Sequence, residues 1–340
     1  MLLAAPSTAT PFAARSVLVT DARGRDQVLT VVKVAWSVPV GGSPVLADEL
    51  GEISQLPVFF EERAPSAIRV PSDLAPEKPG TEVLLVGHAK HPAAYPDARW
   101  VDVTLAVEGE TTRLRKSLRV FGPRNWTKQP NGTWAPSTPA AYEETALRWE
   151  WAFGGPGHPQ NPIGRGLEAS KNGGEDACHR IEVADATSLA PAGFGALAPH
   201  WEPRRSRGGS ATAEDLTPHP PADRDPRHYC SAPDDQWLAS PLRGDETFVV
   251  TGVHAHQAWT FALPLLRPEV SWIIRGRAER AIPHLDTVLL DADAGTVSLS
   301  WRATFPAPRN LSDLEEVFVT SRDAQKPRPL AEPRELAFTD

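Results

Sequence analysis

The sequence predicts a mainly β protein, with antiparallel sheets in one or two β-sandwich-like blocks, long irregular loops and few short helices. Apolar and polar residues alternate with a period of two in most of the patterned segments, which is typical of strands with one buried face. Proline is abundant, at 35 of 340 residues, and it favours turns, edge strands and loops over helix interiors. Helix-capping signals are sparse, which also favours the β class.

The first patterned block lies in the N-terminal part of the sequence. Residues 27–36 (QVLTVVKVAW) are β-branched or apolar apart from one lysine, which indicates a half-buried or central strand. A second strand is expected at 81–86, after a proline-rich turn. Residues 100–107 and 113–120 alternate between apolar and polar side chains, and the Glu-Gly-Glu segment between them predicts a hairpin.

A second patterned block occupies the C-terminal third. Residues 247–253 and 259–263 read as strands. Residues 285–301 predict a hairpin that turns at an Ala-Gly pair. Ser312 is the expected N-cap of a short helix over residues 313–317.

Length and patterning divide the sequence into four segments. A protein of 340 residues is longer than one core usually supports, so two sub-domains or one elaborated sandwich are expected. We expect these segments to pack into one globular unit. They are an N-terminal strand-rich block at 1–125, a loop-rich central region with signature turns at 126–242, a C-terminal strand-rich block at 243–325 and a proline-rich tail at 326–340.

Charge and cysteine content argue against several classes of protein. The net charge of -8 and the pI near 5.7 disfavour a nucleic-acid partner, because such binders normally carry a basic face. Two cysteines, Cys178 and Cys230, are too few for a disulfide framework and fit a reducing compartment. The sequence shows no secretory signal and no window of roughly 20 apolar residues that could span a membrane. We therefore expect a cytoplasmic protein with no nucleic-acid or membrane partner.

Four residues could form a metal site. Cys178-His179 and His228-x-Cys230 would together supply two thiolates and two imidazoles, which zinc accepts. However, an adjacent Cys-His pair lacks the usual ligand spacing, and a long irregular stretch separates the two pairs. We expect structural roles for all four residues, and keep a zinc-dependent hydrolase that uses them as an alternative function.

Two further motifs resemble metal sites. His254-x-His256 would place two rings on one strand face, as some metal sites require, but an exposed strand pair near a loop is favoured. Asp291-x-Asp293-x-Gly295 lacks the remaining ligands of a calcium loop, so a hairpin turn is favoured. Neither motif predicts a bound metal.

A glycine-rich segment could suggest a phosphate site. Gly154-Gly155-Pro156-Gly157 is not followed by a Lys-Ser/Thr pair, and its proline removes an amide donor that a phosphate cradle needs. The sequence also has no G-x-S-x-G nucleophile elbow. The sequence therefore predicts no catalytic residue and no cofactor.

The most distinctive stretch lies in the central region. Three aromatic residues lead into a glycine pair, which predicts a buried aromatic wall that turns into a tight loop. An Asn-Pro-x-Gly-x-Gly turn follows, whose glycines permit positive φ angles. Packing alone would explain this pattern, but ordered loops of this kind are often binding surfaces. The candidate partner-binding residues are Trp149, Trp151, Phe153, Gly154, Gly155, Asn161, Pro162, Gly164 and Gly166.

Short motifs occur in a fixed order from about residue 25 to residue 305. They are residues 32–36 (VKVAW), 78–89 (KPGTEVLLVGHA), 121–126 (FGPRNW), 152–155 (AFGG), 161–166 (NPxGxG), 193–195 (GFG), 232–236 (APDDQ) and 242–246 (LxGxE). In this ordered set the protein resembles the bacterial domain-of-unknown-function family 2169. Members of that family look like accessory proteins of bacterial type VI secretion systems.

The resemblance implies a non-enzymatic adaptor or chaperone. Such a protein would bind a secreted effector protein, a PAAR-like tip protein or the VgrG spike, and would help to load the effector onto that spike. A carbohydrate-binding β-sandwich remains a further alternative, because some of the 11 tryptophans could serve as stacking platforms. The zinc-dependent hydrolase described above is the third hypothesis.

Overall fold

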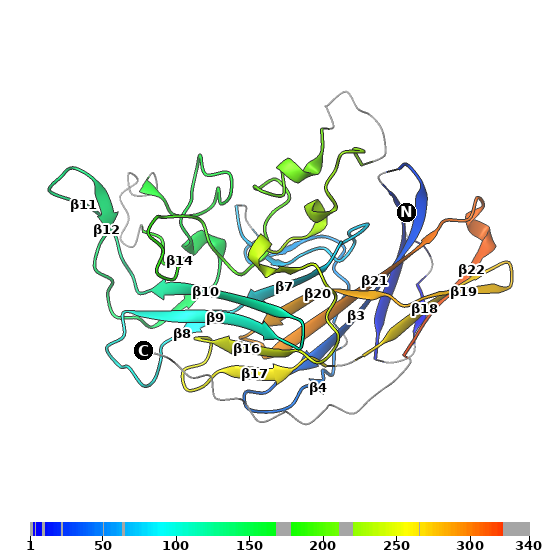
Figure 1. The fold of residues 1–340 in the computed structure, drawn as a ribbon, viewed down its shortest axis with the longest axis horizontal. Coiled ribbons are helices and arrows are strands. Elements are labelled where there is room, and N and C mark those ends of the chain that lie inside the picture. Colours follow the sequence, from blue (N-terminus) through cyan, green and yellow to red (C-terminus); the bar gives the residue numbers. More distant parts are fainter. Residues whose placement is uncertain are drawn as a thin grey trace.

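The computed structural model describes residues 3, 5–8, 11–21, 23–49, 51–62, 65–167, 178–210, 220–264 and 266–321. These residues form two large β-sheets, a smaller third sheet and several two-stranded ribbons (Figure 1). The predicted mainly β class is confirmed. Short 3-10 turns occur at Trp149–Trp151 (η1), Ser206–Gly208 (η2), Pro226–Tyr229 (η3), Asp234–Gln236 (η4) and Leu311–Asp313 (η5).

The largest sheet has seven strands and joins segments from both ends of the sequence. Its order is β15-β7-β20-β21-β3-β2, with β4 paired to β3 off this path. Neighbouring strands are antiparallel except for β7 and β20, which run parallel. The strands are Ala13–Thr20 (β2), Asp26–Ser37 (β3), Val45–Leu46 (β4), Thr81–Val86 (β7), Trp237–Leu238 (β15), His284–Asp291 (β20) and Thr296–Pro306 (β21).

Two strands of this sheet are covered on both faces. β3 is buried without interruption over residues 28–36, and all six residues of β7 are buried. Strands covered on both faces read as continuous apolar runs rather than alternating ones, which is the pattern of both segments. The strands predicted at 27–36 and 81–86, and the hairpin predicted at 285–301, are confirmed.

Charged side chains lie inside the seven-stranded sheet as ion pairs. Lys33 Nζ, in the middle of β3, donates to Asp73 Oδ2 at 2.8 Å, and Ser300 Oγ donates to Asp73 Oδ1 at 3.0 Å. Arg302 Nε donates to Asp286 Oδ2 at 2.7 Å. A buried charge is very unfavourable unless it is paired and hydrogen-bonded. Pairing therefore explains how an apolar strand accommodates its single lysine.

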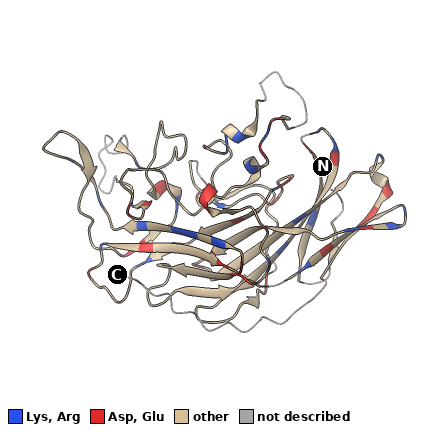
Figure 2. Cartoon of the chain, viewed as in Figure 1, with Lys and Arg blue, Asp and Glu red and all other residues tan. Residues whose placement is uncertain are grey.

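The second large sheet has five antiparallel strands in the order β14-β10-β9-β16-β17. The β9–β10 hairpin, predicted from its alternation, pairs Glu108 with Arg113 beside the turn and Trp100 with Phe121 at the open end. Several basic residues lie along β10 itself (Figure 2). The strands are Trp100–Glu108 (β9), Arg113–Phe121 (β10), Ile181–Val183 (β14), Thr247–Thr251 (β16) and Trp259–Ala262 (β17).

A four-stranded sheet, β1-β22-β18-β19, forms one end of the molecule (Figure 1). The helix predicted over residues 313–317 with Ser312 as its cap is wrong. The Asn310 side chain instead accepts from Ser312 N at a single 3-10 turn, and β22 then pairs with β18. Pairing with a neighbouring strand overrides a weak local helix signal. The strands are Ser7–Thr8 (β1), Pro268–Ile274 (β18), Arg277–Ala281 (β19) and Leu314–Ser321 (β22).

Three two-stranded ribbons complete the described fold. One of them, β11–β12, projects from the end of the molecule opposite to the four-stranded sheet (Figure 1). None of the helices in the described ranges is long and apolar enough to cross a membrane. The ribbons pair Val58–Phe59 (β5) with Ile68–Val70 (β6), His88–Lys90 (β8) with Glu144–Ala146 (β13), and Trp126–Lys128 (β11) with Trp134–Pro136 (β12).

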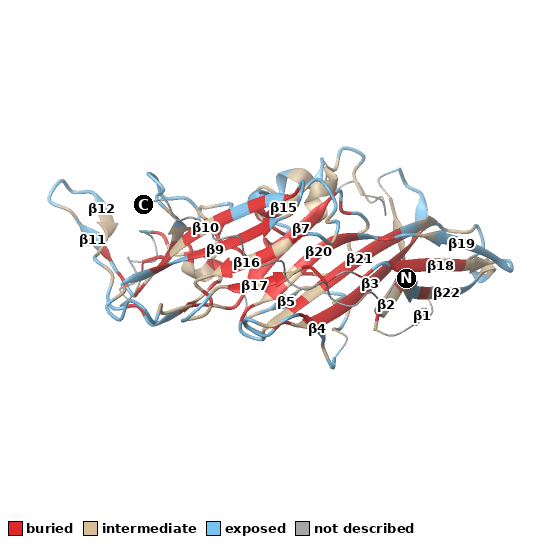
Figure 3. Cartoon of the chain, turned by 60° about the horizontal axis from the view of Figure 1, so that its bottom comes forward, coloured by how far each residue is buried: buried red, intermediate tan, exposed pale blue. Residues whose placement is uncertain are grey.

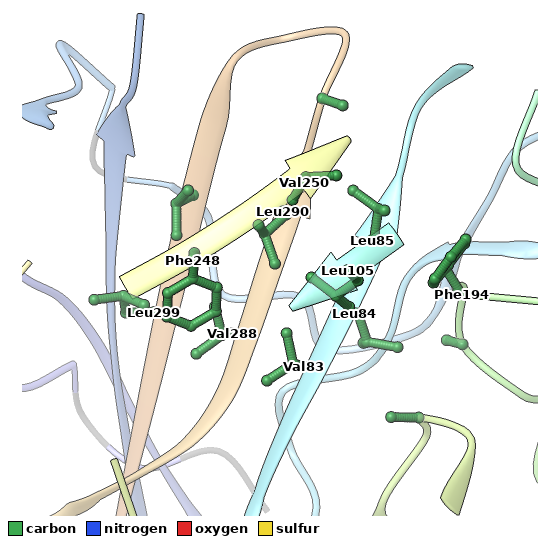
Figure 4. Packing of buried hydrophobic residues seen from close by; sticks show 14 of the residues in the cluster. Val83, Leu84, Leu85, Leu105, Phe194, Phe248, Val250, Val288, Leu290 and Leu299 are labelled. Atoms are coloured by element: carbon green, nitrogen blue, oxygen red, sulfur yellow. The ribbon is translucent and has the colours of Figure 1, made fainter. Parts of the chain in front are cut away.

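One cluster of buried apolar side chains joins the sheets. Side chains of β7, β20 and β21 lie beside Leu105 of β9 and Phe248 of β16, and Phe194 of the central region lies next to β7 (Figure 4). Burial is concentrated in the middle of the long strands (Figure 3). Both large sheets contain strands from segments 1–125 and 243–325, so these segments share one core. The tail at 326–340 lies outside the described residues.

Candidate partner-binding site

The central region is fastened to the large sheets by buried polar side chains. Gln236 Nε2 donates to Val83 O at 2.7 Å and to Phe194 O at 2.9 Å. Lys116 Nζ, on β10, donates to Gly193 O at 2.7 Å and to Gln236 Oε1 at 2.8 Å. Buried polar groups are costly unless they are paired, so these bonds order loops that have little secondary structure.

A second fastening point lies at the start of β7. The Glu82 carboxylate accepts from Lys78 Nζ, and it also accepts from Ser231 N and Ala232 N at 2.5 and 2.8 Å. All four residues are buried. The sequence motifs at 78–89 and 232–236 therefore contact one another, and this contact helps to hold the central region against the seven-stranded sheet.

Trp149 lies in the core beneath the central loops. Its side chain is 4% exposed, and Nε1 donates to Gly195 O at 3.0 Å. The indole packs edge-on against Trp201, with ring centroids 6.0 Å apart. A Cβ placed on Gly193 would lie 2.9 Å from the indole, so the backbone passes directly over the ring. A partner would not reach Trp149 in this fold, and we no longer assign it to partner binding.

The glycine and asparagine turns pack into each other. Asn161 Nδ2 donates to Trp149 O at 2.9 Å and to Phe153 O at 3.0 Å. A Cβ on Gly154 would lie 2.2 Å from Asn161 O, and one on Gly164 would lie 2.3 Å from Asn161 Nδ2. We call this arrangement the Asn161 lock. Its buried members are Gly154, Gly155, Asn161, Gly164 and Gly166. A binding partner could not contact these five residues in this fold.

The remaining candidate residues are half buried: Trp151, Phe153 and Pro162. Two guanidinium groups lie over the Trp151 ring, that of Arg165 at 3.6 Å and that of Arg180 at 4.2 Å from its centroid. Such cation–π contacts hold the ring in one orientation. These three residues are the part of the predicted set that solvent reaches.

The β11–β12 ribbon adds an exposed aromatic residue beside the lock. Trp126, at the base of β11, is buried, and its ring meets Phe153 edge-on at 6.5 Å. Trp126 pairs with Pro136, and Trp134 lies two residues away on the same face of the ribbon. Trp134 is 47% exposed. We call residues 126–136 together with Phe153 the aromatic arm.

The aromatic arm is ordered by its own turn. Gln129 N donates to Thr133 O at 2.7 Å, and Thr133 N donates to Asn131 Oδ1 at 3.0 Å. Sequence reasoning missed this ribbon, although Asn131-Gly132 between two short polar-apolar runs is a hairpin signal. Trp134 also stands out by exposure, because seven of the 11 tryptophans are buried and only Trp100 is as exposed.

A buried histidine lies under Phe153. His179 Nε2 and Glu182 Oε1 are 2.7 Å apart, and Arg124 Nε donates to His179 O. Burial lowers the pKa of His179, so the ring is neutral near pH 7 and donates from Nε2. Burial raises the pKa of Glu182, but the bond from His179 and the charge of Arg124 outweigh it and lower that pKa overall. Cys178 Sγ lies 3.5 Å from His179 Nδ1.

The other two candidate zinc ligands have different neighbours. His228 Nδ1 lies 2.7 Å from Arg204 O, and Cys230 is buried, which raises the pKa of its thiol to about 12. Within the described ranges, no three His, Cys, Asp or Glu residues are grouped as metal ligands. The structure therefore does not bring Cys178 and His179 together with the second pair.

The remaining motifs occupy turns. Asp291 Oδ1 accepts a backbone hydrogen bond within the β20–β21 turn, and Asp293 Oδ2 lies 2.6 Å from His88 Nδ1. His254 is half buried against an indole ring, and His256 is exposed. The hairpin-turn interpretation of the aspartate motif is confirmed.

Comparison with known proteins gives one match. No curated protein and no solved structure matches the sequence. A protein family described as an uncharacterized protein conserved in bacteria, DUF2169, matches residues 23–302. That span includes the five-stranded sheet, the Asn161 lock and the aromatic arm, and it excludes β1 and β22. The protein therefore belongs to the DUF2169 family.

Proposed function

We propose that the protein is a non-enzymatic adaptor or chaperone of a bacterial type VI secretion system, working in the cytoplasm. It binds a secreted effector, a PAAR-like tip protein or the VgrG spike, and helps to load the effector onto that spike. Family membership over residues 23–302 is the observation that carries this proposal, because the resemblance to this family implies the adaptor role.

The aromatic arm is the surface through which we propose that the client is held. Trp134 is an exposed tryptophan, and tryptophan is one of the residue types that most often dominate binding energy at protein interfaces. The arm is ordered by its own turn before any partner arrives. A preordered loop loses little conformational entropy on binding, which favours affinity.

The test has two stages. A tagged copy of the full-length protein is first captured from the cytoplasm of its native host, and the co-purifying proteins are named by mass spectrometry. Recovery of a spike, a PAAR-like protein or a large toxin supports the proposal. If the eluate contains no secretion component, the adaptor role is wrong.

The second stage measures affinity for the purified client. We expect Trp134→Ala to weaken binding by about 30-fold, equivalent to the roughly 2 kcal/mol loss that defines an interface hot spot. Trp100→Ala is the matched control, because Trp100 is also 47% exposed but lies at the start of β9. Equal effects of the two substitutions would contradict the assignment of the aromatic arm.

A final measurement separates an adaptor from an enzyme. We expect the client and the protein to combine in a fixed stoichiometry, with the intact mass of the client unchanged after prolonged incubation. A covalent change in the client at substoichiometric amounts of the protein would instead establish turnover.

A further inference from the structure

A small pocket opens beside β6. It lies between the loops before and after β6 and the segment that begins at Pro199. Its volume is about 240 Å³, and four prolines, Pro57, Pro71, Pro76 and Pro199, contribute to its walls. Pockets for drug-sized molecules measure about 300–1,000 Å³, so this pocket fits a group about the size of one side chain. Different loops build this pocket and the aromatic arm.

Arg204 supplies a fixed positive charge to this pocket. Its Nε donates to His228 O at 2.9 Å and its Nη1 donates to Leu197 O, which holds the guanidinium plane in place. Among the described residues, Nη2 has no hydrogen-bond partner and Arg204 has no ion-pair partner. Burial lowers the pKa of Arg204, although the charge of Glu82 raises it, and a guanidinium stays protonated at neutral pH. The pocket therefore holds a partly buried cation with an unused donor.

No carboxylate of the described residues pairs directly with Arg204. Arg224 also lacks a carboxylate partner in the described ranges, since its Nε donates to Gly208 O and its Nη1 to Tyr229 Oη. The nearby Glu82 carboxylate is already bonded to Lys78. Other arginines of the same segment are paired: Arg205 with Glu202, Arg207 with Asp234, and Arg227 with Asp225.

We call the exposed apolar residues next to Pro57, which lines the pocket, the rim. Leu56, Val58 and Phe59 flank Pro57 in sequence and are 77%, 47% and 48% exposed. Exposed apolar residues grouped beside a binding pocket are typical of surfaces that bind polypeptides. The rim and the pocket together combine one cationic position with several apolar ones.

We propose that this pocket binds a carboxylate group of a polypeptide through Arg204, while the prolines and the rim contact its apolar residues. A carboxylate suits the pocket better than a phosphate, because a phosphate has more oxygens to satisfy and the pocket offers few donors. The carboxylate comes from the C-terminus of a polypeptide or from an Asp or Glu side chain. This site goes beyond the adaptor role and does not use the aromatic arm.

The chemistry is tested first with small probes on the full-length protein, by calorimetry. We expect butyrate to bind at least about tenfold more tightly than butyramide, its neutral isostere, because a charge-assisted hydrogen bond is lost with the charge. We also expect butyrate to bind more tightly than inorganic phosphate. Equal binding of butyrate and butyramide, or tighter binding of phosphate, would overturn the proposal.

Substitutions then place the site. Arg204→Gln abolishes butyrate binding, and Arg205→Gln, which changes an exposed neighbour paired with Glu202, leaves it unchanged. Because Arg204 also bonds two backbone carbonyls, a second pair guards against misfolding: Pro199→Glu places a repelling carboxylate at an exposed wall position, and Pro199→Gln is its neutral control. Retained binding in both Arg204→Gln and Pro199→Glu would place the site elsewhere.

Two peptides identify the source of the carboxylate. One is acetyl-Leu-Leu-Leu with a free C-terminus, and the other is acetyl-Leu-Leu-Glu amide; the fully neutral acetyl-Leu-Leu-Leu amide is the control. We expect one of the charged peptides to bind at least tenfold more tightly than both butyrate and the neutral peptide. The tighter of the two shows whether the pocket takes a C-terminal carboxylate or a side-chain carboxylate. If neither exceeds butyrate, the rim does not contact a polypeptide and that part of the proposal fails.

Discussion

Replacing Trp149 with alanine tests whether the aromatic wall is core or contact surface. The substitution removes an indole that is 4% exposed, together with the hydrogen bond from Nε1 to Gly195 O. Truncating a buried tryptophan to alanine costs about 3–5 kcal/mol, and leaving a buried carbonyl without its donor adds about 1 kcal/mol. We expect the free energy of unfolding to fall by about 4–6 kcal/mol.

That loss converts to a measurable change in melting temperature. Unfolding entropy near 60 °C is about 2.1 cal/mol/K per residue, or about 0.7 kcal/mol/K for 340 residues. A loss of about 4–6 kcal/mol therefore lowers Tm by about 6–8 °C if the protein unfolds as one cooperative unit. Differential scanning calorimetry measures this change directly, and urea denaturation checks it at 25 °C.

The matched control is Trp134→Ala. Trp134 is 47% exposed on the aromatic arm, so its truncation should change the free energy of unfolding by no more than about 0.5 kcal/mol. The reasoning is refuted if Trp149→Ala leaves Tm unchanged, or if both substitutions lower it equally. Either result would mean that the indole of Trp149 is not packed as the structure has it.

Three further predictions concern the lock, the buried histidine and a thiol. Gly154→Ala should destabilise the protein by about 3 kcal/mol or more in urea, because its Cβ would meet the Asn161 carbonyl at 2.2 Å; Gly157→Ala, with nothing within 4 Å, should cost only about 1 kcal/mol. Burial lowers the pKa of His179 below the 6.5 of an unfolded histidine, so protonation favours the unfolded state. The stabilisation from neutral His179 is fully present above about pH 6.5 and is lost as the pH falls from there toward the folded-state pKa. The urea midpoint of unfolding should therefore drop between pH 7 and pH 5. The His179→Gln variant should show a smaller drop. Cys230, whose thiol pKa is raised to about 12, should resist iodoacetamide at pH 8 in the native protein and react after unfolding; rapid native labelling would contradict its burial.

The long strands were predictable because two-sided burial imposes a local signature. β3 and β7 are covered on both faces and read as unbroken apolar runs, and the β9–β10 hairpin shows clean alternation. The strands that were missed lack such a signature. β19 reads Arg-Ala-Glu-Arg-Ala and is mostly exposed, and β22 begins with residues that also suit a helix. Their structure depends on pairing with β18, which is information from elsewhere in the sequence.

The candidate site was only partly predictable for a related reason. Residues 149–166 stand out in the sequence, but an irregular loop has no period that would tell which aromatic side chain faces the core. The contact between Asn161 and Gly154 joins two turns, and only the folded backbone shows how closely they approach. Trp134 could have been found, since the Asn-Gly turn beside it predicts a projecting hairpin.

The order of strands in the seven-stranded sheet has a consequence for synthesis on the ribosome. β3 ends at Ser37, whereas its long partner β21 ends at Pro306, about 270 residues later. At roughly 5–20 residues per second, the nascent β3 waits about 13–54 s for that partner. During this time its apolar run is an aggregation hazard, and a charge inside such a run discourages self-association. We therefore expect Lys33, which pairs with Asp73 in the finished sheet, to limit self-association of the growing polypeptide before the sheet exists.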